Sequence, residues 1–64
     1  MYKATVEFYG DDGKVVGTFV ADAGEDYTSI RNLVARINTK VALRQIEDIA
    51  TAMGAQDYRA VLVA

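Results

Sequence analysis

The residues of this chain that could do chemistry are mainly basic, and they lie close together in the sequence. The stretch from 27 to 46 contains four basic residues and no acidic one. The four are Arg31, Arg36, Lys40 and Arg44. On one continuous helix the last three would form a stripe, because they are spaced four residues apart. Such a stripe could bind phosphate groups or an acidic protein, although a run of charges is more often a solvated helix face.

Most side chains of ordinary catalytic or metal centres are missing. The sequence has no Cys and no His, which removes disulfides and the common zinc sites. A nucleophile and its base would have to come from Ser29 or a threonine with a lysine, or from paired carboxylates. Ser29, the single serine, lies where a helix is expected to begin. No Gly-rich phosphate-binding pattern is present. We therefore expect a non-enzymatic protein that needs neither a metal nor an organic cofactor.

Length and composition predict a single domain over residues 1–64. A chain of this size buries only about 60% of the surface that its unfolded form exposes, yet 52% of the residues are hydrophobic. A net charge of −2 gives no general attraction to nucleic acid or anionic lipid. No apolar stretch approaches the roughly 20 residues of a membrane span, and the N-terminus does not resemble a signal peptide. We expect a cytoplasmic protein.

The first third of the chain predicts a β-hairpin. Residues 2–9 alternate between apolar and polar positions, as in a half-buried strand. Residues 10–13 read Gly-Asp-Asp-Gly, which suits a tight turn. Residues 14–21 are expected to form the returning strand, and Gly17 within it suggests a bulge or a close backbone approach.

Helix follows the hairpin, and a last strand follows the helix. Asp26 or Thr28 can cap a helix N-terminus, residues 29–53 contain neither Gly nor Pro, and Gly54 can end the helix. We expect helix between about 27 and 53. The β-rich run near 57–63 then predicts a third strand.

The phase of the apolar residues shows that one straight helix would be apolar on nearly opposite sides. At about 100° per residue, one set lies roughly 150° away from the other. The first set is Ile30, Leu33, Val34, Ile37 and Val41, and the second is Ala42, Ile46, Ile49, Ala50 and Met53. A break near Asn38 and Thr39, which both suit N-caps, is the favoured interpretation. A long helix shared with a second chain is the alternative.

The predicted fold class is α+β, in the order strand, strand, one or two helices, strand. The sheet is three-stranded, antiparallel or mixed, and packs on the helical layer. A helical hairpin would place the last strand antiparallel to strand 14–21 or parallel to strand 2–9, whereas a single helix would place it antiparallel to strand 2–9. The expected core is Val6, Phe8, Phe19, Ile30, Val34, Ile37, Ile46, Ile49, Met53 and Leu62.

We expect this small α+β domain to be a protein-interaction or regulatory module, of the inhibitor or adaptor type, that acts as a homodimer. Its core is small, its helical region is apolar on two faces, and its last strand carries only Arg59 against edge pairing. The expected self-association residues are Ile49, Met53, Tyr58, Val61 and Val63. An unidentified protein would bind the four basic residues. The alternative is a small nucleic-acid-binding regulator that uses Arg31–Arg44, and no membrane partner is expected.

Overall fold

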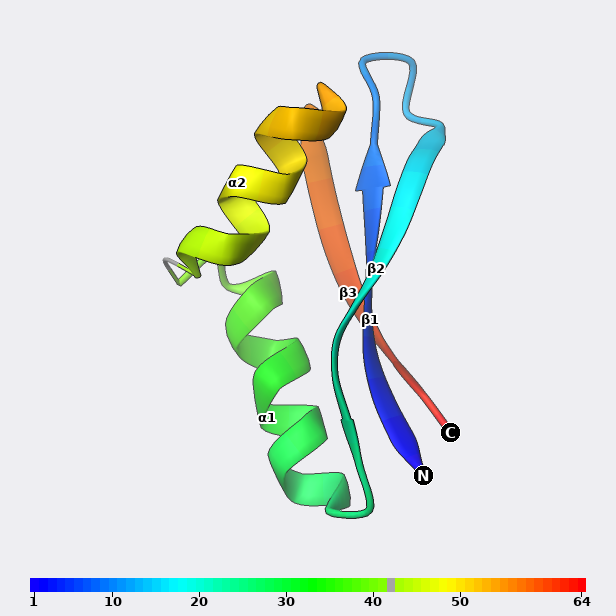
Figure 1. Cartoon of the computed structure of the whole chain (residues 1–64), viewed down its shortest axis with the longest axis vertical. Coiled ribbons are helices and arrows are strands. Elements are labelled where there is room, and N and C mark those ends of the chain that lie inside the picture. The colour runs from blue at the N-terminus through cyan, green and yellow to red at the C-terminus, as the bar shows by residue number, and fades with distance from the viewer. Residues whose placement is uncertain (42) are drawn as a thin grey trace.

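The computed structural model describes residues 1–41 and 43–64. Within these residues, three strands and two helices follow one another in the order ββααβ. A three-stranded sheet forms one layer, and both helices lie on one side of it (Figure 1). This confirms the predicted α+β class and the antiparallel form of the sheet. The elements are β1 (Tyr2–Tyr9), β2 (Val15–Gly24), α1 (Tyr27–Asn38), α2 (Arg44–Met53) and β3 (Asp57–Val63).

The hairpin of β1 and β2 turns where the sequence predicts. The Gly10 N–H donates to the Lys14 carbonyl at 2.9 Å, and the Gly13 N–H donates to the Gly10 carbonyl at 3.0 Å. Gly13 has a φ of 79°, which glycine adopts without steric cost. β2 continues to Gly24, past its expected end. Register shifts on either side of the central pairs leave Val16 and Ala21 as bulges.

Gly17 lies beside a bulge and under a side chain, rather than being itself a bulge or close to another backbone segment. A Cβ built there would lie 2.9 Å from the Met53 sulfur. Gly17 itself pairs with Phe8 in the ladder, and the neighbouring bulge is at Val16. The missing side chain therefore lets α2 end directly above β2.

The first and the last end of the helical region have the expected caps. The Thr28 and Ser29 N–H groups donate to Asp26 Oδ1 at 3.0 and 3.3 Å, and the Ser29 hydroxyl donates to Oδ2 at 2.9 Å. These bonds, the Ser29 hydroxyl foremost, lower the pKa of Asp26. At the other end of the helical region, Gly54 adopts a left-handed conformation with a φ of 70°.

The helical region is broken, as the apolar phase predicts. α1 ends at Asn38, Lys40 has a φ of 58°, and α2 begins at Arg44. The expectation that Asn38 or Thr39 caps the second helix is wrong, because its N-cap is Leu43, which gives no side-chain bond. Thr39 instead donates its hydroxyl to the Arg36 carbonyl at 3.0 Å. Ala42, assigned to the second apolar set, lies outside the described residues.

The position of the last strand differs from the one expected for two helices, which was antiparallel to strand 14–21 or parallel to strand 2–9. The strand order is β2-β1-β3, and β3 runs antiparallel to β1, with Ala60 opposite Val6. This is the arrangement expected for a single helix. The reason is that α1 and α2 follow each other in the same general direction along the sheet rather than forming a hairpin (Figure 1). The chain therefore reaches the far end of the sheet before β3 begins.

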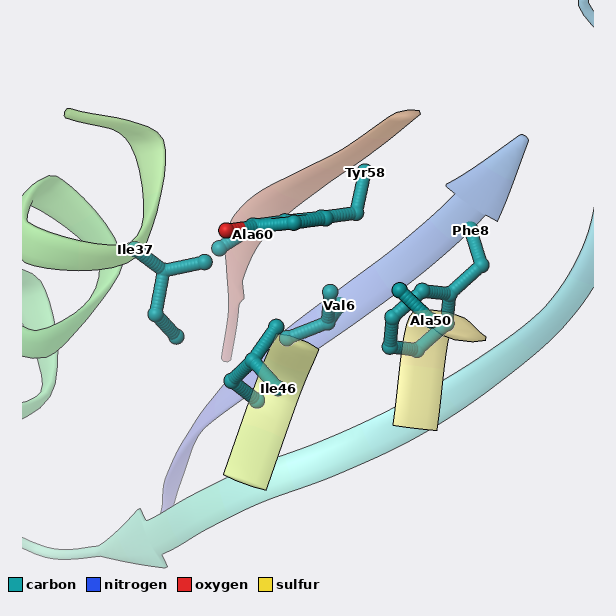
Figure 2. Close-up of a cluster of buried hydrophobic side chains, with 7 residues drawn as sticks. All are labelled: Val6, Phe8, Ile37, Ile46, Ala50, Tyr58 and Ala60. Atoms are coloured by element: carbon teal, nitrogen blue, oxygen red, sulfur yellow. The ribbon is translucent and has the colours of Figure 1, made fainter. Parts of the chain in front are cut away.

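The core lies between the inner face of the sheet and the two helices (Figure 2). Of the expected core residues, five are buried, namely Val6, Phe8, Ile30, Ile37 and Ile46. Four are only half-buried, namely Phe19, Val34, Ile49 and Leu62. Met53 is 38% exposed and Val41, from the first apolar set, is 51% exposed, so neither belongs to the core.

The sequence prediction missed small residues and one tyrosine. Ala4, Ala50, Tyr58 and Ala60 are buried as well. Three of these are alanines, which leave room for the helices to pack closely on the sheet. Small side chains give a weak hydrophobic signal in a sequence, although they are common in tightly packed interiors.

Shortening Ile37 should cost much of the stability of this domain. Ile37 is 1% exposed, and Ile→Ala changes at such sites cost about 2–5 kcal/mol. Urea denaturation of Ile37→Ala should therefore give a markedly lower midpoint than the wild type. Val41→Ala is the control, because a change at an exposed position stays within about 0.5 kcal/mol. Equal losses for both variants would contradict the packing described for α1.

Candidate interaction surface

The two outer strands of the sheet have very different surroundings. The strand order makes β2 and β3 the edges, with β1 between them. An edge strand presents a row of unpaired N–H and C=O groups to which another strand can add. What covers each edge therefore decides where this domain could bind a partner strand.

A single side chain covers the middle of the β3 edge. Asn38 donates from Nδ2 to the Ala60 carbonyl at 2.9 Å. In return, the Ala60 N–H donates to Asn38 Oδ1 at 2.7 Å. The side-chain amide thus makes the two hydrogen bonds that a residue of a neighbouring strand would make. Asn38, the last residue of α1, therefore occupies the place of a fourth strand at this point.

Lys40 covers the next outward carbonyl of β3. Its ammonium donates to the Tyr58 carbonyl, lies 3.0 Å from Asp57 Oδ1 and sits 3.5 Å from the centre of the Tyr58 ring. The hydrogen bond from Lys40 is the main cause that lowers the pKa of Asp57, and the Tyr58 N–H adds to it. Together, Asn38 and Lys40 occupy the edge of β3 from Asp57 to Ala60.

Tyr58 belongs to the core and not to an exposed interface. It is 8% exposed, and its ring lies 6.1 Å from that of Phe8, centre to centre. Its hydroxyl donates to Glu47 Oε1 at 2.7 Å. Burial first, and this carboxylate second, raise the pKa of Tyr58 to about 12. Of the residues expected to mediate self-association, Tyr58 is the one whose side chain is already enclosed.

The four basic residues do not form one stripe. Arg36 lies in the last turn of α1, Lys40 is bound at the edge of β3, and Arg44 is the first residue of α2. The stripe was expected only on a continuous helix, and the helical region breaks between Arg36 and Arg44. Arg31 lies on α1, with its guanidinium 5.8 Å from the centre of the Tyr27 ring. The structure therefore gives Lys40 a structural contact and distributes the three arginines over two helices.

The outer side of β2 has no neighbouring strand among the residues that the structure describes. Val15, Val16 and Val20 along it are 50%, 51% and 48% exposed. No charged residue occurs between Lys14 and Asp22. An exposed, uncharged and apolar edge of this kind is a place where strands of other molecules add.

The end of α2 extends this apolar edge on the helical side. Met53 contacts Gly17, and Ile49, one turn before it, is half-buried. Both were expected to mediate self-association. Val61 and Val63, from the same expected group, alternate with Ala60 and Leu62 on β3 and so point to the open face of the sheet. The structure thus brings Ile49 and Met53 to β2 but places the two valines on the opposite face.

The open face of the sheet combines valines with charged residues. Val63 at one end is 43% exposed. Toward the other end, Arg59 lies 3.9 Å from Glu7, which also accepts a hydrogen bond of 2.9 Å from the Tyr9 hydroxyl. That hydrogen bond is the main cause that raises the pKa of Tyr9. Charged and hydrogen-bonded groups therefore interrupt the apolar part of this face, unlike the edge of β2.

A shallow pocket of about 250 Å³ opens between the end of α1, the start of α2 and β2. Its walls are mostly aliphatic. Among the described residues that line the pocket, one is charged, namely Arg44. The lining residues are Ala21, Leu33, Ile37, Leu43, Arg44, Gln45 and Ile46. The pocket can hold an apolar side chain, and its lining offers no acid–base pair for catalysis.

Comparisons with known proteins give no relative: no family model, no curated protein and no solved structure matches this chain. Neither helix of the part that the structure describes has the length and apolar character needed to cross a membrane.

Removing the Asn38 amide should destabilise the domain measurably. Asn38→Ala leaves the Ala60 N–H and carbonyl without a protein partner, and such a loss costs about 1–3 kcal/mol when the group is shielded from water. Asn32→Ala is a matched control on the same helix, at an exposed position, where the change should stay within about 0.5 kcal/mol. Denaturant titrations that give equal stabilities for the two variants would contradict the role of Asn38.

The pKa of Asp57 should depend on Lys40. Because the pKa of Asp57 is lowered from 3.8 in the folded state, its contact stabilises the fold above the unfolded value. This contribution is lost as the pH falls through the folded value. NMR titration of Lys40→Met should show the pKa of Asp57 moving back up. The pKa of Asp26 is the internal control, since Ser29 lowers it. An unchanged Asp57 pKa in the variant would refute the contact.

Proposed function

We propose that this chain is a non-enzymatic protein-interaction module that binds by adding a strand at the outer edge of β2. The observation that carries the proposal is the difference between the two edges. Asn38 and Lys40 occupy the edge of β3, whereas the edge of β2 is exposed and uncharged between Lys14 and Asp22. A domain under selection only against edge pairing would protect both strands.

The backbone groups that a partner would use can be assigned from the ladder. Tyr58 and Ala60 direct their carbonyls away from β1, toward Lys40 and Asn38. Hydrogen-bonded and non-bonded pairs alternate along an antiparallel ladder. Their partners on β1, Phe8 and Val6, therefore direct their backbone groups toward β2.

The same alternation continues across β2. Val6 and Phe8 pair with Phe19 and Gly17, so these two residues of β2 direct their backbone groups toward β1. Thr18 and Val20 then direct theirs outward, toward a potential partner. In strand addition such main-chain groups supply affinity, and flanking side chains supply specificity.

The alternative function, binding of nucleic acid by the region Arg31–Arg44, has less support from the geometry. Lys40 is engaged with Asp57, and Arg36 and Arg44 lie on different helices. Phosphate contacts would give an affinity that falls steeply with salt. A salt titration with generic DNA and RNA therefore distinguishes this function from strand addition, which depends on uncharged backbone groups.

Replacing Thr18 by proline should abolish partner binding without unfolding the sheet. Proline removes the outward N–H, and edge strands tolerate proline where the N–H faces solvent. Thr18→Val is the matched control, because it keeps the N–H and the branched shape. We expect affinity capture from a native lysate to recover the same proteins with the wild type and Thr18→Val, and to lose them with Thr18→Pro. Circular dichroism checks the fold of each variant. Capture that survives in a folded Thr18→Pro would show that another surface binds.

A further inference from the structure

We infer that the strand added at the β2 edge is the β2 strand of a second copy, paired antiparallel about a twofold axis at Thr18. The inference rests on the proposed function and names its partner. Its basis is the charge pattern of the strand, which is complementary to itself. Lys14 and Asp22 are the charged residues that bound the apolar stretch, and each is four positions from Thr18. A twofold axis at Thr18 therefore places Lys14 of each copy opposite Asp22 of the other.

The backbone alternation is compatible with this register. In this pairing the two Thr18 residues lie opposite each other, and both direct their N–H and C=O groups outward. They therefore exchange two hydrogen bonds across the axis, as in an ordinary antiparallel ladder. An axis at Phe19 would also give a regular ladder, because Thr18 of each copy would then exchange hydrogen bonds with Val20 of the other. It would, however, place Lys14 opposite Gly24 and leave both charges of the strand without an opposite charge. The charges therefore select the axis at Thr18.

The side chains that meet in this register also suit one another. Because Val16 is a bulge, both Val15 and Val16 of one copy lie across from Val20 of the other, which covers residues that are 50%, 51% and 48% exposed. Gly17 lies opposite Phe19, and an aromatic residue across from an edge glycine fills the space that the glycine leaves. Cross-strand pairs of β-branched and aromatic residues are favourable.

The helices add a second part to the interface. A twofold axis perpendicular to the sheet keeps the helical layers of both copies on the same side. Met53 lies directly over Gly17, so Phe19 of the second copy approaches the Met53 thioether, a favourable sulfur–aromatic contact. Ile49, half-buried one turn earlier on α2, flanks the same contact.

Bulges restrict how much of β2 can pair. The regular ladder with β1 runs from Gly17 to Val20, between the bulges at Val16 and Ala21. A bulge increases the local twist of a strand, which confines the regular hydrogen-bonded pairing to the residues between the two bulges. The interface is therefore short, and we expect a dimer that dissociates reversibly between about 1 µM and about 1 mM. One bulge lies between Thr18 and each of the two charged residues, so the two extra residues offset each other and Lys14 of one copy stays opposite Asp22 of the other.

Charge reversal at the two ends of the strand tests the inference. Lys14→Glu places two carboxylates opposite each other at both ends of the dimer, and Asp22→Lys places two ammonium groups there. Each variant alone should self-associate roughly tenfold more weakly than the wild type. In an equimolar mixture, a heterodimer of the two variants has opposite charges facing each other at both ends, and it should form with roughly the wild-type affinity. Sedimentation equilibrium at low salt measures all four samples, with Thr18→Pro as the monomeric reference.

Other results would contradict the partner, the register or the binding edge separately. A wild type that is monomeric up to about 1 mM overturns the second copy as partner, and the proposed function stands if Thr18-dependent capture of another protein persists. Dimers that are insensitive to either reversal, or variants that do not recover in the mixture, overturn the register. A dimer that persists in folded Thr18→Pro overturns both this inference and the β2 edge as its site. Recovery in the mixture also shows that both variants are folded.

Discussion

The two hydrogen bonds between the Asn38 amide and the Ala60 backbone join the end of α1 to the edge of the sheet. They connect positions far apart in the sequence and fix the end of α1 beside Ala60 of β3. The chain turns directly after this point. Lys40, in the turn, has a left-handed backbone conformation, and its ammonium group donates to the Tyr58 carbonyl of β3. The direction of α2, and with it the contact between Met53 and Gly17, follows from where this turn is anchored.

The helical region breaks because apolar residues on both sides of the break must face the same core. Ile37 near the end of α1 and Ile46 near the start of α2 enter the same core (Figure 2). A continuous helix would turn one of them away from the sheet. The turn corrects the phase without reversing the chain, so both helices cover the sheet in sequence. A left-handed Lys40 is unfavourable by itself, and its contacts with Asp57 and Tyr58 offset that cost.

Much of this fold can be predicted from the sequence, and the exceptions share one cause. Alternation in residues 2–9, the turn at Gly10–Gly13, the Asp26 cap and the Gly54 stop are local signals, and the structure confirms each. The direction of α2 and the place of β3 depend on contacts between distant residues, which no local pattern reports. Asn38 shows this well, since its residue type and position suit an N-cap while its actual partner is Ala60. The candidate surface can be predicted only in part, because the contacts of Asn38 and Lys40 that cover the edge of β3 join residues distant in the sequence.

The covered edge of β3 would also limit the size of an assembly built on the proposed pairing through β2. In that dimer both outer strands of the combined sheet would be β3, and each β3 edge carries Asn38 and Lys40. A further copy would not find a row of open backbone groups, so the proposed assembly would stop at two instead of continuing as a fibril. Asn38, at the end of α1, would then set the number of subunits without touching the interface between them.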